Sequence, residues 1–274
     1  MSTAPVSAAK IPPTAIEPVT ELPEDMPRVS MLGRAARILN SFGPQEWVLS
    51  LAELTRKSGL PKPTAHRIAA ELADLGLLER SGKGYCLGIQ LVEIGQRSWW
   101  QCGLRDTALP FLEYLREATN HTVNLGVLAD TDVVYLAKLP GADNDVRISR
   151  TGARLPAHST GLGKAILAFS PPATLRSVVE SGLARCGPRT IIMPRRFIRE
   201  MALIRQRGTA FDIEESGPGV LCVAAAISLN HTRVLGSLSI SGCSTAAELD
   251  RTRPIVESVA RELSRRLTAE EITQ

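Results

Sequence analysis

The alternation of apolar and polar positions is most regular between Leu49 and Tyr85. It predicts short helical segments that end at Gly59, a tight turn, a longer helix that begins at Pro63, and a hairpin. Glycine permits the left-handed conformation that ends many helices, and proline in a first helical turn loses no intrahelical hydrogen bond. Apolar residues of the longer helix recur at spacings that place them on one buried stripe. This order of elements predicts a winged helix-turn-helix, a structure that reads duplex DNA.

The polar face of the longer helix carries side chains that can donate hydrogen bonds to phosphate oxygens or base edges. Arg67 is the candidate for a base contact, because its guanidinium can bind the two acceptors of a guanine edge at once. Lys83, at the tip of the hairpin, can reach a backbone phosphate or the minor groove. The alternative is that these residues form only the solvated face of a small helical bundle. The residues expected to contact DNA are Ser50, Lys62, Thr64, His66, Arg67 and Lys83.

The charge of this segment favours DNA as the partner. Between Arg28 and Lys83 the chain has nine lysines or arginines and five aspartates or glutamates, whereas its formal net charge as a whole is only +4. One basic patch is typical of a module that faces phosphates. Aromatic residues make up 4% of the chain, which argues against the stacking platforms that bind single strands or RNA.

The cysteines and histidines indicate neither a disulfide framework nor a metal site. The five cysteines are odd in number, widely spaced and without a CxxC pair, and the four histidines lack ligand spacing. We therefore expect reduced thiols and no metal or other cofactor. Because no apolar run approaches about 18 residues and no signal-peptide segment is evident, we expect a soluble, cytoplasmic protein without membrane contact.

Composition and pattern predict the domain organisation. The first residues are rich in proline and small side chains and cannot bury enough surface to become ordered. After the hairpin, an apolar helix contains Trp99 and Trp100, which are consistent with a dimer contact, with docking against a second domain, or with ordinary core packing. The expected boundaries are 1–27 for a disordered tail, 28–88 for the DNA-binding domain, 89–103 for a linker helix and 104–270 for the second domain.

The second domain alternates between strand and helix patterns. Period-two runs bounded by turn residues predict antiparallel strand pairs, with helices between and after them. Antiparallel strands flanked by helices imply an α+β fold class in which helices cover a sheet. The expected strands are Thr122–Val127, Asp132–Leu139, Leu221–Leu229 and Arg233–Ser241, and the expected helices are at Leu109–Ala118, around Ala165, at Arg196–Arg207 and at Ala246–Leu267.

The segment GARLPAHSTGLGK precedes the helix around Ala165. Its Ser159, Thr160 and Gly161 stand where hydroxyls and backbone N–H groups at a helix start can hold a small anion. The segment does not match a P-loop, because His158 replaces the first required glycine and Ala165 replaces the serine or threonine that binds magnesium. The alternative is an ordinary capped loop that packs a helix on the sheet.

Polar residues also occur in and after the later strands. Asp212 and the acidic run that follows it come after a short strand pattern, and Ser239 and Ser241 share one face of their strand. A strand cysteine such as Cys222 is usually a small core residue, and an acidic loop is usually solvated. Spacing alone therefore does not select these residues as a site.

Residues 29–270 resemble the IclR family of bacterial transcriptional regulators. The resemblance rests on the segments LAELTRKSGLPKPTAHRIAAEL, GYCLG with its following helix, GARLPAHSTGLGKAILA and GTAFDIEESGPGVLCVAAAIS. It implies an N-terminal winged helix-turn-helix, a linker helix and a C-terminal GAF-like domain that binds small organic acids. It also implies a homodimer, commonly paired into a tetramer on DNA.

The same resemblance implies an effector pocket. Donors at a helix start can hold a carboxylate, Cys222 would form a weakly polar wall, and Asp212 would accept from a hydroxyl or water. The VAAAI segment departs from the family, whose members often have proline after the second of these alanines, and this departure bears on the pocket's shape. The implied effector-binding residues are Ser159, Thr160, Gly161, Asp212, Cys222, Ser239 and Ser241.

We therefore expect a DNA-binding transcriptional regulator, not an enzyme, that serves a catabolic operon and responds to a small carboxylate or aromatic acid. One alternative is an enzyme that uses Cys222 as nucleophile, which would need a base such as His121, His158 or His231. The other is a metabolite-sensing oligomer whose winged helix makes only protein contacts.

Overall fold

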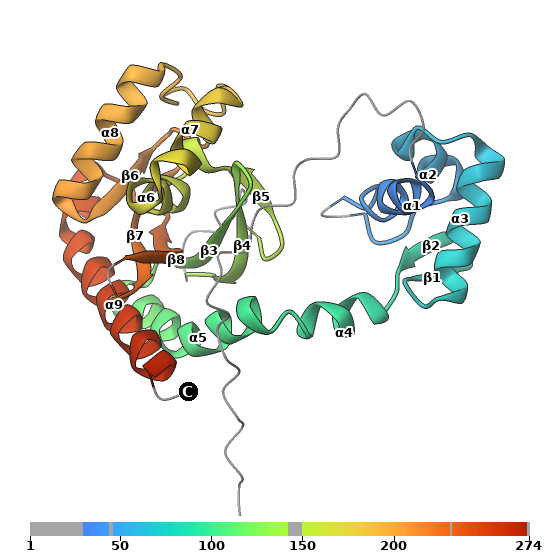
Figure 1. The fold of residues 1–274 in the computed structure, drawn as a ribbon, viewed down its shortest axis with the longest axis horizontal. Helices are drawn as coiled ribbons and strands as arrows, with labels where there is room; N and C mark the ends of the chain where they lie inside the picture. Colours follow the sequence, from blue (N-terminus) through green and yellow to red (C-terminus); the bar gives the residue numbers. More distant parts are fainter. Residues whose placement is uncertain (1–29, 44–45, 142–149, 231, 273–274) are drawn as a thin grey trace, which may run out of the picture. The chain divides into compact units, whose positions relative to one another are not determined.

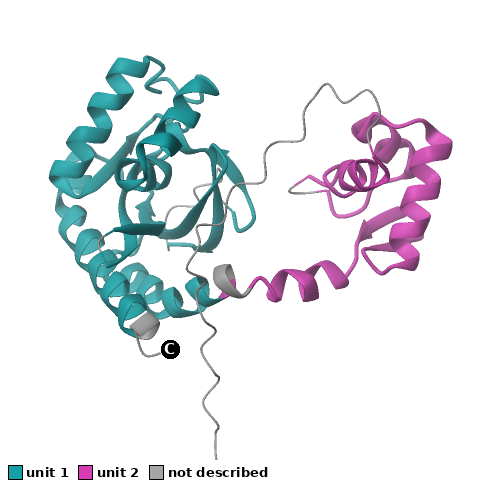
Figure 2. Cartoon of the chain, in the orientation of Figure 1, with its two compact units in different colours: residues 1–19, 103–274 teal, residues 20–102 magenta. Residues whose placement is uncertain are grey.

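The computed structural model describes residues 30–43, 46–141, 150–230 and 232–272, which form two compact units (Figure 2). The N-terminal unit extends to residue 102 and the C-terminal unit begins at residue 103. The predicted disordered tail lies outside the described residues, as does His231 in the predicted hairpin turn.

The N-terminal unit begins with the predicted winged helix-turn-helix, which the order of its elements confirms (Figure 1). Leu49, just before the second helix, pairs with Tyr85 of the hairpin, and its N–H donates to the Tyr85 carbonyl at 2.9 Å. The elements are α1 (Met31–Leu39), α2 (Leu51–Ser58), α3 (Lys62–Asp74), β1 (Leu78–Ser81) and β2 (Gly84–Leu87). Their common core consists of Ile38, Leu49, Leu54, Leu60, Ala65, Ile68, Ala69, Leu72, Leu78 and Tyr85.

A capping box, a glycine and two prolines mark where α2 begins and ends and where α3 begins. The Ser50 hydroxyl accepts from the Glu53 N–H at 3.3 Å, and the Glu53 carboxylate accepts from the Ser50 N–H at 2.8 Å. This capping box satisfies two N–H groups at the start of α2. Gly59 ends α2 with a φ of 65°, and α3 follows at once with Pro61 as its N-cap and Pro63 in its first turn.

The region after the hairpin differs from the single linker helix expected at 89–103. It forms α4 (Gln90–Gln96) and a much longer helix, α5 (Trp99–Thr119), which also includes the helix predicted as the start of the second domain. The break follows Gly95, a weak helix former. Pro110 lies inside α5 on an exposed position, so the sequence pattern there does not indicate one continuous helix. The side chains of the two tryptophans at the start of α5 lie outside the described part.

The C-terminal unit is built on an antiparallel sheet of six strands in the order β5-β4-β3-β8-β7-β6. Helices α6, α7 and α8 cover one face, and α9 runs along the other (Figure 1). This arrangement confirms the α+β class. The elements are β3 (Thr122–Ala129), β4 (Asp132–Leu139), β5 (Arg154–Pro156), the 3-10 turn η1 (Ala157–Ser159), α6 (Gly161–Phe169), α7 (Pro172–Glu180), α8 (Pro194–Arg207), β6 (Thr209–Ile213), β7 (Leu221–Leu229), β8 (Arg233–Ser241) and α9 (Ala246–Ile272).

The sequence pattern does not predict β5, η1 or α7. Both β5 and η1 contain only three residues, too few to show a period. Helix α7 has only nine residues, and its apolar stripe of Leu175, Val178 and Val179 covers little more than one turn. Across the described residues, no helix has the length and apolarity that crossing a bilayer requires.

The register of four strands brings several of the predicted polar residues onto one side of the sheet. Asp212 of β6 pairs with Cys222 of β7, and Cys222 pairs with Ser241 of β8. Ser239, two positions earlier on β8, pairs with Asn124 of β3. Paired residues share a face, as do residues two apart on one strand. All five side chains therefore lie on the same face of the sheet.

Helix α6 lies unusually close to the turn that precedes it. Every residue from Gly161 to Ala168 is buried. A Cβ at Gly163 would lie 2.1 Å from the carbonyl oxygen of Ala157 and 2.4 Å from its Cα, so no larger residue fits without a backbone shift. The close contact with Ala157 explains why position 163 is a glycine. A glycine in this place, which phosphate-binding loops also have, therefore has a structural reason here.

We expect Gly163→Ala to lower the free energy of unfolding of the C-terminal unit by about 1–3 kcal/mol, because overpacking forces the backbone to move. Gly103→Ala is the matched control: it lies in α5 with no atom within 4 Å of an added Cβ, and alanine there should stabilise by up to about 1 kcal/mol. Urea denaturation followed by circular dichroism measures both. Equal effects of the two substitutions would contradict the close contact with Ala157.

Candidate functional site

Four of the residues predicted to contact DNA lie in the first two turns of α3. Lys62, His66 and Arg67 are exposed, and Thr64 is half-buried. Arg67 Nη1 lies 3.1 Å from Glu71 Oε1, and both side chains are 53% exposed. An exposed pair of this kind contributes little to stability, so Arg67 can leave Glu71 for a base or phosphate at small cost.

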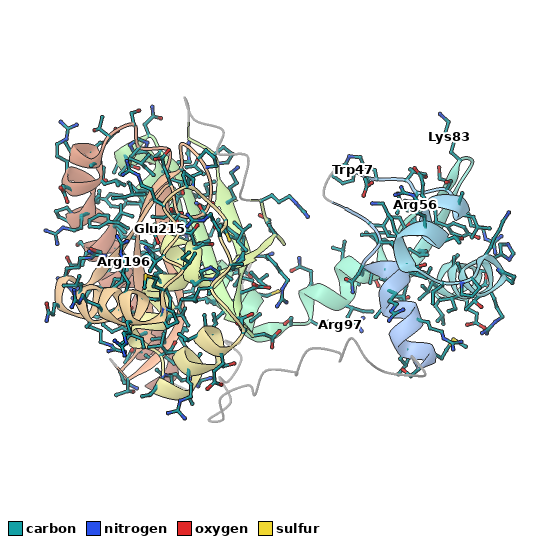
Figure 3. All side chains as sticks on the ribbon, turned by 90° about the horizontal axis from the view of Figure 1, so that it is seen from above. Trp47, Arg56, Lys83, Arg97, Arg196 and Glu215 are labelled. Carbon is teal, nitrogen blue, oxygen red and sulfur yellow. The ribbon has the colours of Figure 1, made fainter. Side chains whose placement is uncertain are left out.

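The other two predicted residues lie outside α3. Lys83 is at the outer end of the β1–β2 hairpin and is exposed (Figure 3). Ser50 caps α2, and its hydroxyl also donates to Glu53 Oε2 at 2.7 Å. A contact between Ser50 and DNA would therefore compete with the capping box, whereas Lys83 needs no rearrangement.

A small cavity of about 20 Å³, room for little more than one water molecule, lies between the start of α6 and the sheet. It brings together six of the seven residues that the family resemblance implies. Ser159 is the exception, because it lies in η1 and its hydroxyl donates to the Pro156 carbonyl at 3.1 Å. The cavity is lined by Tyr135, Thr160, Gly161, Leu162, Asp212, Ser216, Val220, Cys222, Ser239 and Ser241.

Asn124 positions the two serines, and sequence reasoning missed it. Its Nδ2 donates to the Ser241 hydroxyl at 3.1 Å and to the Ser239 hydroxyl at 3.4 Å. Ser241 also accepts from the Cys222 thiol at 3.1 Å. A hydroxyl has one proton and two lone pairs, so a serine that accepts from its neighbours keeps its proton for a ligand. The signal in the sequence was a lone asparagine in the otherwise apolar strand TVNLGVLA.

The start of α6 supplies further donors. The Thr160 hydroxyl accepts from the Gly163 N–H at 3.0 Å, as expected of an N-cap. The N–H groups of Gly161 and Leu162 belong to the first helical turn, where no intrahelical acceptor is available, and both residues line the cavity. Together with the positive end of the helix dipole, these groups favour an anion.

Asp212 holds the loop beside the cavity. Its Oδ1 accepts from the N–H groups of Glu215 at 2.8 Å and Ser216 at 3.2 Å, and its Oδ2 accepts from the Ser216 hydroxyl at 2.5 Å. Burial raises the pKa of Asp212 above its ordinary value, and these hydrogen bonds oppose that rise. The geometry thus gives Asp212 a role in shaping the wall, in addition to the predicted one of accepting from a ligand.

The thiol of Cys222 is poorly suited to nucleophilic chemistry. Cys222 is buried, and this burial raises the pKa of its thiol well above the ordinary value. Thiolates, not thiols, are the nucleophiles. Tyr135, which the sequence analysis also missed, is buried on the same cavity wall, and burial raises the pKa of its hydroxyl as well. Both groups are neutral at physiological pH and can act as hydrogen-bond donors.

A buried ion pair lies beside the cavity. Lys164 of α6 is 1% exposed, and its Nζ contacts Glu215 Oε1 (Figure 3 labels Glu215). Among the described side chains, Glu215 Oε2 is one of the buried atoms without a hydrogen-bond partner. Burial raises the pKa of Glu215 to about 7, and the attraction of Lys164 only partly offsets this rise. The carboxyl therefore sits close to its titration midpoint at neutral pH.

This pKa implies that stability depends on pH. Between about pH 4.5 and pH 7 the folded protein keeps a proton on Glu215 that the unfolded chain releases, so the free energy of unfolding falls as pH rises through this window. Glu215→Gln, which mimics the protonated carboxyl, should remove this contribution and make the free energy of unfolding less dependent on pH in this window. Urea denaturation at several pH values compares the two proteins. Parallel curves for the wild type and the variant would contradict the raised pKa.

Two family models match the chain. The model described as the IclR helix-turn-helix domain matches residues 31–82, and the model described as the bacterial transcriptional regulator IclR C-terminal matches residues 97–265. Together these matches cover both units. They include α3 in the first unit and the cavity in the second.

Individual relatives agree with these matches. The regulator XynR of Escherichia coli strain K12 is 31% identical over 248 residues, which cover 88% of this chain and 98% of that protein. The structure of an IclR homologue from Microbacterium hydrocarbonoxydans complexed with 4-hydroxybenzoate has a TM-score of 0.80 at 26% identity, covering 89% of this chain and all (100%) of that one. The Thermotoga maritima IclR structure has a TM-score of 0.70 at 30% identity, covering 86% and 98%. The chain therefore belongs to the IclR family of bacterial transcriptional regulators.

Proposed function

We propose that this chain binds operator DNA through α3 and the β1–β2 hairpin, and that a small organic acid in the α6 cavity controls that binding. The observation that carries the proposal is the convergence of donors in the cavity. Two serine hydroxyls positioned by Asn124 and the first turn of α6 face one small space. Such an array fits a carboxylate, because charged acceptors form the strongest hydrogen bonds with fixed donors.

The relatives support an acid as ligand. The Microbacterium hydrocarbonoxydans homologue was solved with 4-hydroxybenzoate, a small carboxylate. A phenolic acid also has a second polar end, and Tyr135 on the cavity wall can meet such a group. The relatives include the glycerol operon regulatory protein of Streptomyces coelicolor. We infer that this chain serves a catabolic operon.

The acid can control operator binding only if it binds two arrangements of the protein with different affinities. By linkage, if the acid weakens operator binding by some factor, operator DNA weakens acid binding by the same factor.

We infer that the active form is a homo-oligomer, a dimer or a pair of dimers. Supporting this, Ile89 and Val92 are exposed and lie three positions apart, on one side of α4, where a second chain can cover them.

A catalytic role for Cys222 is the weaker candidate. The buried thiol has a raised pKa and donates to Ser241, and no feature of the cavity lowers that pKa enough to form a thiolate at neutral pH. We infer that the protein acts by binding alone.

The other alternative is a chain whose winged helix makes only protein contacts. Such a chain would show no operator binding at low salt, and a gel shift against the upstream region of its own gene tests this.

We expect Arg67→Ala to weaken specific DNA binding by about 1–3 kcal/mol and to relax the preference at one operator position. Lys83→Ala should instead weaken binding to all sequences alike and reduce the salt dependence. Fluorescence anisotropy with operator variants at several salt concentrations measures both effects.

Arg265→Ala is the matched control for Arg67→Ala. Arg265 is also an exposed helical arginine paired with a glutamate on its own helix, but it lies on α9 in the C-terminal unit. We expect it to leave operator affinity unchanged. If Arg67→Ala behaved like this control, Arg67 would have no part in DNA recognition.

We expect Ser239→Ala to weaken binding of an acidic effector roughly 10- to 100-fold, the effect of losing one hydrogen bond to a charged group. A thermal-shift screen of small aliphatic and aromatic carboxylates, with 4-hydroxybenzoate among them, identifies the compound, and calorimetry then measures its affinity. Ser237→Ala is the control, because Ser237 is buried two positions earlier on β8 but donates to the Leu162 carbonyl at 2.9 Å. Equal losses of affinity in both variants would place the acid elsewhere.

A further inference from the structure

Three potential metal ligands, none of which lines the α6 cavity, meet at the end of the β3–β8 pair. His121 precedes β3, Cys243 follows β8, and Glu248 lies in the first turn of α9. The register explains their meeting, because Thr122 pairs with Ser241 and so places the residues flanking these two strand ends side by side. His121 is far along the chain from Cys243 and Glu248, which is why ligand spacing in the sequence gives no indication of the three together.

The three ligand atoms are already close together. A ring nitrogen of His121, the Cys243 sulfur and a Glu248 carboxylate oxygen all lie within 4.8 Å of one another. The His121 Nε2 to Glu248 Oε1 distance is 3.1 Å. In a tetrahedral zinc site, bond lengths of 2.0–2.3 Å separate the ligand atoms by about 3.3–3.8 Å. The histidine and glutamate are therefore nearly at ligand separation, and the sulfur needs to approach by no more than about 1.5 Å.

The unequal exposure of the three ligands suits a metal ion that keeps one coordination position open to solvent. Cys243 is buried at 3% exposure, whereas the side chains of His121 and Glu248 are 11% and 26% exposed. Solvent can thus supply a fourth ligand from the glutamate side. Glu248 Oε2 accepts from the Ser244 N–H at 2.7 Å, and this hydrogen bond fixes the carboxylate as partners of metal ligands commonly do.

We propose that His121, Cys243 and Glu248 form a binding site for a borderline divalent transition-metal ion such as Zn²⁺, with water as the fourth ligand. One thiolate, one imidazole and one carboxylate form a donor set that zinc accepts and that magnesium or calcium, which require oxygen ligands, does not.

Cobalt is the probe, because Co²⁺ occupies zinc sites and a thiolate ligand gives it an intense near-ultraviolet absorption that oxygen and nitrogen ligands do not. The full-length chain, free of affinity tags and treated with chelator, is titrated with Co²⁺ and then with Zn²⁺. We expect one equivalent of Co²⁺ per chain to produce the thiolate band, and one equivalent of Zn²⁺ to abolish it.

Three variants test the ligands. Cys243→Ser should remove the thiolate band, and His121→Gln and Glu248→Gln should each weaken Co²⁺ binding by at least about tenfold, since even the loss of an outer partner costs 10- to 100-fold. Glu248→Gln keeps a carbonyl oxygen for the Ser244 N–H, so it tests charge without removing that hydrogen bond. Cys186→Ser is the control, because Cys186 is a free cysteine elsewhere in the unit, and it should bind like the wild type.

Two results would overturn the proposal. One is the absence of a stoichiometric thiolate band in the wild-type chain, which would leave His121 and Glu248 as a simple hydrogen-bonded pair at the start of α9. The other is a band that survives in Cys243→Ser, which would assign the metal to another cysteine. If Cys243→Ser does not fold, unchanged affinity in both the His121→Gln and Glu248→Gln variants would have the same meaning.

Discussion

Helix α6 is buried from Gly161 to Ala168, and a helix buried along almost its whole length takes its polar N-terminus into the interior with it. The N–H groups of a first helical turn lack intrahelical acceptors, and leaving them unpaired in an apolar interior is costly. Thr160 satisfies one of these groups. Gly161 and Leu162, which carry two of the others, line the cavity. The packing of the helix thus explains why polar backbone groups are found beside this cavity.

The same burial explains the ion pair between Lys164 and Glu215. Lys164 lies on the buried helix with 1% of its side chain exposed, so its charge needs a partner inside the protein. The backbone N–H of Glu215 donates to Asp212. This bond holds the loop that contains Glu215 and forms part of the cavity wall. The pair therefore ties the helix start to this loop. A change in the protonation of Glu215 alters the contact that holds one wall of the cavity in place.

The sequence was sufficient for features that depend on local pattern. The winged helix-turn-helix was predictable because Gly59, Pro61 and Pro63 fix the turn through backbone conformation alone. The strands of the central hairpins were predictable from their alternation, and the family resemblance supplied the cavity residues.

Features that depend on contacts between distant segments were not predictable. In the sequence, little distinguishes Asn124 from an ordinary strand residue. Only the pairing of β3 with β8 places it opposite Ser239. Ser159 shares a motif with Thr160, yet the 3-10 turn directs its hydroxyl to Pro156. Cys243 and His121 become neighbours only through strand register. Helix α5 continues through Pro110 against the local preference of proline.

Helix α5 has a mechanical consequence. It contains 21 residues, begins before the division between the two units and continues into the second one. At 1.5 Å per residue it is about 30 Å long, so a tilt of about 5° at one end displaces the other end by about 3 Å. Pro110 lacks one backbone N–H near the middle, and bending is least costly there. In a helix of this length, a small change in angle at one end corresponds to a shift at the other end comparable to the length of a hydrogen bond.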